Sequence, residues 1–167
     1  MIPVDGVPVI SRTLSILEPL FGEIIVAGWP GGDLPPGDVR IVNDNYRGVG
    51  PLAGIEAALR ITRSQQLFVF GGDMPWLSEE LIRLQIAEYV KEPSDILVAR
   101  YLGLAEPLHS IYNRRIHPAL VKYIEGGGSN SIIDFLRHVE THWFDLPVTE
   151  ETRKALTNIN RPEDLLS

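Results

Sequence analysis

The feature that most constrains the fold is an alternation of short, mostly apolar segments with segments of helical periodicity. The apolar segments predict buried strands at residues 24–27, 39–42, 67–70, 95–99, 108–112 and 141–144. Helical patterns lie between them, beginning near residues 9, 51, 79, 116 and 131. Strands that alternate with helices predict a mostly parallel sheet covered on both faces. Because no internal repeat or linker is visible, we expect a single domain over residues 1–167.

Composition excludes several classes of function. The chain has no cysteine, which excludes disulfides, thiolate zinc sites and cysteine nucleophiles. The formal net charge is −7 and the Lys and Arg residues are scattered, which argues against a nucleic-acid-binding surface. No apolar run is long enough to cross a membrane and no signal peptide is evident, so we expect a cytoplasmic protein. A small phosphate ligand remains compatible with this charge, because backbone N–H groups and a metal ion can bind it locally.

Asp73 is the clearest candidate for chemistry. It follows the most strongly apolar strand segment, 67–70, and two glycines that allow the backbone to approach a ligand closely. Ligands of parallel α/β sheets bind beyond the carboxyl ends of the strands, where this carboxylate should lie. Carboxylate oxygens suit Mg²⁺, which also binds substrate phosphates. The alternative interpretation is a turn that Pro75 and Ser78 complete before the next helix.

Two further segments should lie at the same edge of the sheet. Residues 50–54 begin a helix after a strand, and their small side chains expose backbone N–H groups to a base or phosphate. The segment is not a Walker A loop, and a glycine-rich turn is its structural alternative. Asp44 follows the strand 39–42 and could accept hydrogen bonds from a nucleobase or ribose, unless it only completes an Asn/Asp turn.

Other polar residues give weaker signals. Asn158 and Asn160 alternate along the chain and would face one side of an extended segment, although a turn before a short helix explains them equally well. Glu106-Pro107 is typical of a turn, and the segment 106–109 could border a pocket. The histidines at positions 117, 138 and 142 show no ligand-like spacing, so no chemistry is assigned to them.

Taken in order, these motifs resemble those of the molybdenum cofactor guanylyltransferases, the MobA-like nucleotidyltransferases. The matching residues are 2–10, Asp44, Gly50, Pro51, Leu52, Ala53, Gly54, 73–75 and 158–164. The resemblance implies a Rossmann-like three-layer α/β/α sandwich that transfers GMP from Mg-GTP to the phosphate of the molybdenum-pterin cofactor. It also implies transient contacts with proteins of that pathway.

The resemblance assigns roles to individual residues. Asp73 would bind Mg²⁺ and be catalytic, and Asp44 and the segment 50–54 would lie against the guanine nucleotide. Asn158 and Asn160 would face the pterin. The family also carries a first strand, a glycine-rich loop and a lysine before the segment that matches residue 2. This chain shows none of them, and its first lysine is Lys91.

The absent element has consequences for fold and function. Without the first strand, a central position of the sheet would be empty, which is costly because neighbouring edges lose hydrogen-bond partners. Either a preceding segment is missing from this chain or the protein is a shortened relative, and on these energetic grounds we expect the first. Two alternatives to the guanylyltransferase interpretation stay open: another nucleotidyltransferase, using CTP or a sugar phosphate, and a non-catalytic nucleotide-binding or assembly module.

Overall fold

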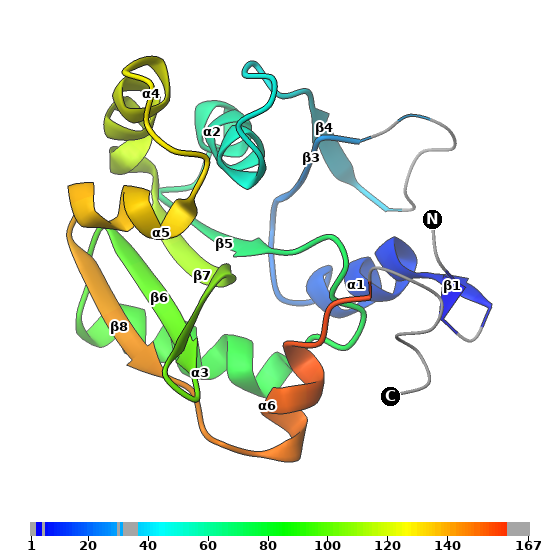
Figure 1. The fold of residues 1–167 in the computed structure, drawn as a ribbon. Coiled ribbons are helices and arrows are strands. Elements are labelled where there is room, and N and C mark those ends of the chain that lie inside the picture. The colour runs from blue at the N-terminus through cyan, green and yellow to red at the C-terminus, as the bar shows by residue number, and fades with distance from the viewer. Residues whose placement is uncertain (1–2, 5, 30, 32–36, 160–167) are drawn as a thin grey trace.

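A computed structural model describes residues 3–4, 6–29, 31 and 37–159 (Figure 1). Its strands are β1 (Pro3–Val4), β2 (Val7–Pro8), β3 (Ile24–Ala27), β4 (Val39–Val42), β5 (Gln66–Phe70), β6 (Ile96–Tyr101), β7 (Leu104–Asn113) and β8 (Thr141–Asp145). Its α-helices are α1 (Val9–Leu17), α2 (Pro51–Ile61), α3 (Glu79–Lys91), α4 (His117–Glu125), α5 (Ile132–Phe135) and α6 (Glu150–Ala155). The 3₁₀ turns η1 (Arg114–Ile116) and η2 (Leu136–His138) precede α4 and follow α5. None of these helices is both long and apolar enough to cross a membrane.

The strands form one larger sheet and two pairs. The four-stranded sheet has the order β5-β7-β6-β8, in which β7 runs antiparallel to both of its neighbours and β8 runs parallel to β6. Three of its four strands, β5, β6 and β8, therefore run in one direction. The β3–β4 pair is parallel, and β1–β2 is a short antiparallel hairpin.

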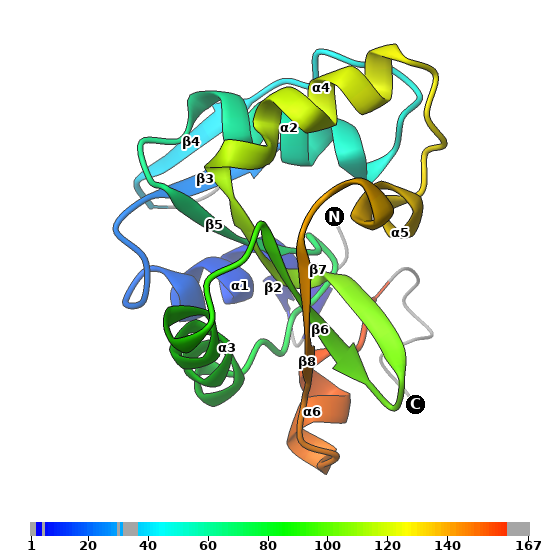
Figure 2. The same ribbon diagram turned by 90° about the vertical axis from the view of Figure 1, so that its left-hand side faces the viewer.

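Helices cover both faces of the larger sheet, as Figure 2 shows. On one face, Val98 and Tyr112 of the sheet pack with Leu52 of α2 and with buried residues of α4 and α5. On the other face, Leu97 and Ile111 pack with Tyr89 of α3. Consecutive residues of a strand point to opposite faces, so two apolar layers form around one sheet. The expected Rossmann-like three-layer α/β/α fold is confirmed.

One local prediction was wrong. Glu106-Pro107 is not a turn but part of β7, and the hairpin with β6 turns at Leu102-Gly103 instead. The β6–β7 register shifts between Leu97 and Ala99, as it does at a β-bulge, so Pro107 needs no ladder hydrogen bond. Within the bulge, the hydroxyl of Ser110 donates to the Glu106 carbonyl at 2.7 Å and accepts from Ala99 N–H at 3.1 Å.

An apolar cleft of about 740 Å³ lies between the β3–β4 pair and the four-stranded sheet. It lies between β3 and β5, and residues of α1, α2 and α3 also line it. Glu23 accepts a 3.1 Å hydrogen bond from Arg63 N–H, which brings the segments just before β3 and β5 together at one end of the cleft. Within the described ranges, β3 pairs only with β4, and β5 pairs only with β7. Each therefore has a backbone edge without a strand partner next to the cleft.

Candidate nucleotide site at the carboxyl edge of the sheet

The loop after β5 holds Asp73 against the backbone. Asp73 is half-buried, and a methyl group on Gly71 would come within 2.7 Å of its Oδ1 atom. Only a glycine at position 71 therefore permits this position of the carboxylate. The buried hydroxyl of Thr13 in α1 donates to the carbonyl of Met74 at 3.2 Å, and Met74 is itself buried. The close approach to Gly71 and the hydrogen bond from Thr13 thus hold the loop in place, while the Asp73 carboxylate keeps access to solvent.

Asp44 lies where β3, β4 and α2 meet. It lies two residues after the end of β4 and is exposed. A methyl group on Gly28, after β3, would lie 3.6 Å from its Oδ2 atom, and one on Gly54, in α2, would lie 3.9 Å from its Oδ1 atom. The carboxylate therefore lies over backbone that no side chain covers. This open, acidic surface could accept N–H groups of a flat heterocycle.

The helix between the two acids presents its amino end to the same region. Gly50 is the N-cap of α2, with φ of 61° and no side-chain cap, and Pro51 follows at the first helical position. The uncapped first turn carries the positive end of the helix dipole, which favours an anion. Leu52 and Ala53 are instead buried, at 1% exposure each, so they support the helix rather than line an open site.

The cleft between β3 and β5 connects these groups. Ala27 and Gly54, beside Asp44, line it together with Gly71 and Gly72, beside Asp73. The predicted acids thus lie near the same end of one cleft. Sequence position predicted this placement, because both acids follow strands that run in the same direction.

The predicted pterin residues lie partly outside the described structure. Ile159 is buried and donates its N–H to the carbonyl of Asp73 at 2.8 Å, which brings the exposed Asn158 next to the Asp73 loop. Helix α6 leads into this segment, and Lys154 of α6 lies over the ring of Trp76, 5.9 Å from its centroid. Asn160 lies outside the described residues.

The segment 106–109 was a weaker candidate. Phe70 of β5 is paired with His109, so the part of β7 before His109 extends past the end of β5 toward the Asp73 loop. Leu108 accepts a 2.9 Å hydrogen bond from Gly71 N–H and lines the cleft. Glu106 is half-buried, and desolvation raises the pKa of its carboxyl group. His109 is fully buried and is not among the residues that line the β3–β5 cleft.

These features suit a divalent metal and a nucleoside triphosphate. Asp73 offers hard oxygen ligands at a strand end and is partly exposed, which suits a metal such as Mg²⁺ that also binds substrate phosphates. The uncapped start of α2 is compatible with a phosphate or sugar, and Asp44 with a base. A Rossmann-like fold that carries Asp44, Asp73 and the start of α2 at the carboxyl edge of its strands defines the class of protein, which is a nucleotidyltransferase.

The chain belongs to the MobA-like NTP transferase family, whose model matches residues 1–141. Its relatives include a probable molybdenum cofactor guanylyltransferase of Carboxydothermus hydrogenoformans, 30% identical over 98% of this chain and 83% of that protein. A molybdenum cofactor guanylyltransferase of Vibrio parahaemolyticus is 25% identical over 99% of this chain and 83% of that protein.

Solved structures show the same fold. Molybdopterin-guanine dinucleotide biosynthesis protein A of Archaeoglobus fulgidus superposes with a TM-score of 0.78 at 23% identity, over 99% of this chain and 85% of that one. The 2-C-methyl-D-erythritol 4-phosphate cytidylyltransferase of Thermus thermophilus superposes with a TM-score of 0.68 at 15% identity, over 95% and 85%.

Proposed function

We propose that this protein transfers GMP from Mg-GTP to the terminal phosphate of the molybdenum-pterin cofactor and releases pyrophosphate. The observation that carries the proposal is the common position of Asp44 and Asp73 near one end of the β3–β5 cleft. The names of the relatives at 25–30% identity favour a guanine nucleotide and this acceptor. These names agree with the placement of Asp44 and Asp73, and this agreement supports a transferase rather than a purely structural protein.

Each residue has a role in the proposed reaction. An oxygen of the acceptor phosphate attacks the α-phosphorus of GTP in line, a new P–O bond forms, and the α–β bridging bond breaks to release pyrophosphate. Asp73 holds the divalent ion, and the start of α2 contacts the nucleotide. When bound, Mg²⁺ offsets the negative charge of the triphosphate. Asp44 accepts N–H groups of guanine, and Asn158, beside the Asp73 loop, contacts the pterin.

The cleft itself favours an additional strand as part of the active protein. Its apolar walls suit a short apolar strand. Such a strand could pair with the edges of β3 and β5 that have no strand partner among the described residues. The carboxyl end of a strand parallel to β3 and β5 would emerge between Asp44 and Asp73. A glycine-rich loop at that point would reach the phosphates. Activity is therefore best measured both with the chain alone and with a chain extended at its N-terminus by such a strand and loop.

Asp73→Asn tests the proposed metal ligand. The substitution keeps the size of the side chain but removes its charge, so we expect GMP transfer in the extended protein to fall by at least about 100-fold, or roughly 2.7 kcal/mol. Asp38→Asn is the matched control, because Asp38 is exposed and lies before β4, away from the carboxyl edge. Pyrophosphate release reports the reaction, and circular dichroism checks the fold. Normal turnover by Asp73→Asn would eliminate Asp73 as the ligand.

Competition binding separates the proposed nucleotide from its alternative. The cytidylyltransferase fold neighbour keeps CTP as a second candidate. We expect GTP to displace a fluorescent guanine nucleotide at lower concentration than CTP, in the presence of Mg²⁺, and Asp44→Ala to reduce that difference. If GTP and CTP displaced the probe equally well from the unaltered protein, the assignment of guanine to Asp44 would be contradicted.

A further inference from the structure

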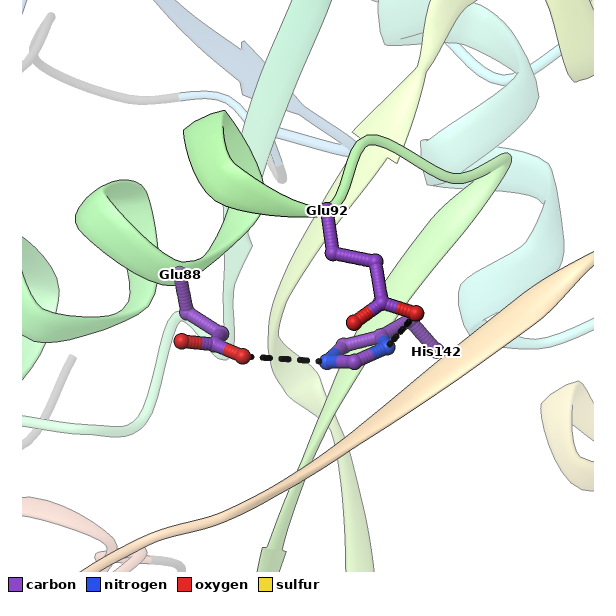
Figure 3. A group of neighbouring side chains, drawn as sticks. All are labelled: Glu88, Glu92 and His142. Carbon is purple, nitrogen blue, oxygen red and sulfur yellow. Dashed lines mark ion pairs between the residues drawn. The ribbon is translucent and has the colours of Figure 1, made fainter.

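A second group of ligand-type side chains lies far from the nucleotide site. Glu88 and Glu92 stand one helical turn apart at the end of α3, and His142 lies on β8 (Figure 3). One donor atom from each residue can be chosen so that all three lie within 4.8 Å of one another. His142 is paired with Leu97, near the start of β6. The cluster is therefore at the opposite edge of the sheet from Asp73, which follows the end of β5.

The ion-pair contacts within the cluster use both nitrogens of the His142 ring and are longer than ordinary hydrogen bonds. His142 Nε2 lies 3.5 Å from Glu88 Oε1, and His142 Nδ1 lies 3.5 Å from Glu92 Oε1. Both distances exceed the usual range of about 2.7–3.2 Å for a hydrogen bond. Two ligands bound about 2.1 Å from a tetrahedral zinc ion are roughly 3.4 Å apart, close to the spacing of Glu88 Oε1 and His142 Nε2. Because one ion can bind only one nitrogen of the ring, the exposed Glu92 would turn from Nδ1 toward Nε2 to join the same site. As Figure 3 shows, both carboxylates approach the imidazole ring.

The charges in this position are unfavourable without a cation. Two glutamates four residues apart repel each other. They also lie at the carboxyl end of α3, where the helix dipole disfavours anions. The nearest described lysine partner is Lys91, whose exposed Nζ lies 3.5 Å from Glu88 Oε2. A pair of acids that opposes both rules favours a cation beside it, and a metal ion bound to His142 would supply that charge.

We propose that Glu88, Glu92 and His142 bind a divalent transition-metal ion, of which Zn²⁺ fits best. One imidazole nitrogen and two carboxylate oxygens match zinc, whereas Mg²⁺ prefers oxygen ligands alone. Glu88 and His142 are largely buried, with side-chain exposures of 24% and 19%, and come from two regular elements. Glu92 is exposed and can adjust its rotamer to complete the site. The ion would join the end of α3 to the strand β8 and leave a coordination position for water.

Isothermal titration of the whole chain with ZnCl₂ tests the site. We expect one zinc ion per chain, a rise in melting temperature with Zn²⁺ but not with Mg²⁺, and ligand-field absorption when Co²⁺ replaces zinc. His142→Asn and Glu92→Gln should each weaken binding by more than about tenfold, a loss that even outer partners of a metal ligand cause. Glu92 is exposed, so its substitution should not disturb folding.

Two controls give the experiment its specificity. His138→Asn removes an exposed histidine outside the cluster and should leave zinc affinity unchanged. Asp73→Asn should also leave it unchanged, which distinguishes this ion from a metal at the nucleotide site. The proposal is overturned if the chain binds no zinc, or if His142→Asn and Glu92→Gln bind it as tightly as the unaltered protein does.

Discussion

The buried imidazole of His109 makes the stability of this protein depend on pH. The side chain is fully buried on β7, and its ring stands edge-on to Phe68 and Phe70, with centroids 5.3 Å and 5.4 Å away. Neither ring nitrogen has a hydrogen-bond partner in the described structure. Burial penalises the charged form and lowers the pKa of His109 to about 4 from its ordinary value of 6.5.

The sign and size of the effect follow from proton binding. Between pH 6.5 and 4 the unfolded chain binds a proton at this position and the folded chain does not, so protonation favours unfolding. The free energy of unfolding is therefore unaffected by His109 above pH 6.5 and falls as the pH drops toward 4. The difference in pKa corresponds to about 3 kcal/mol in total. About 2 kcal/mol of this would be lost between roughly pH 7 and pH 5.

Urea unfolding of the unaltered protein and of His109→Leu measures this contribution. Other titrating groups act equally in both proteins, so the difference between their free energies of unfolding isolates His109. We expect His109→Leu to lose about 2 kcal/mol less than the unaltered protein between roughly pH 7 and pH 5. The exposed His138 provides a matched control, because His138→Leu removes a histidine that lies outside the core. Parallel profiles for His109→Leu and the unaltered protein would refute the reasoning.

Two glycine substitutions should separate the site from the stability of the fold. Gly71→Ala would place its Cβ 2.7 Å from Asp73 Oδ1, so we expect that carboxylate to be displaced and GMP transfer to be lost. Urea unfolding should show a destabilisation of about 1–3 kcal/mol. Unchanged turnover would contradict the position of Asp73 described above. Gly54→Ala lies within α2 and should stabilise the protein by up to about 1 kcal/mol. Its Cβ, 3.9 Å from Asp44 Oδ1, should nevertheless weaken nucleotide affinity in titration calorimetry, and unchanged affinity would place the nucleotide elsewhere.

Local sequence patterns predicted most elements of the fold. The strands at residues 24–27, 39–42 and 67–70 and the helix after Ser78 are visible because apolar runs, glycines and capping residues act over short distances. Ser78 is the N-cap of α3, and its hydroxyl accepts a hydrogen bond from Leu81 N–H at 3.3 Å. The short helix α6, with Thr149 as its cap, was not predicted, although Thr149 followed by Glu150 and Glu151 was an available signal.

What the sequence by itself determined is therefore the order and type of most elements and the position of Asp44 and Asp73 after strands. Tertiary structure alone decided the reversed direction of β7, the cleft between β3 and β5, and the burial of His109. It also joined His142 to Glu88 and Glu92, which are fifty-four and fifty positions away along the chain. The physical reason is that strand pairing and side-chain packing bring together residues distant in sequence, and no local pattern of apolar and polar residues records those distances.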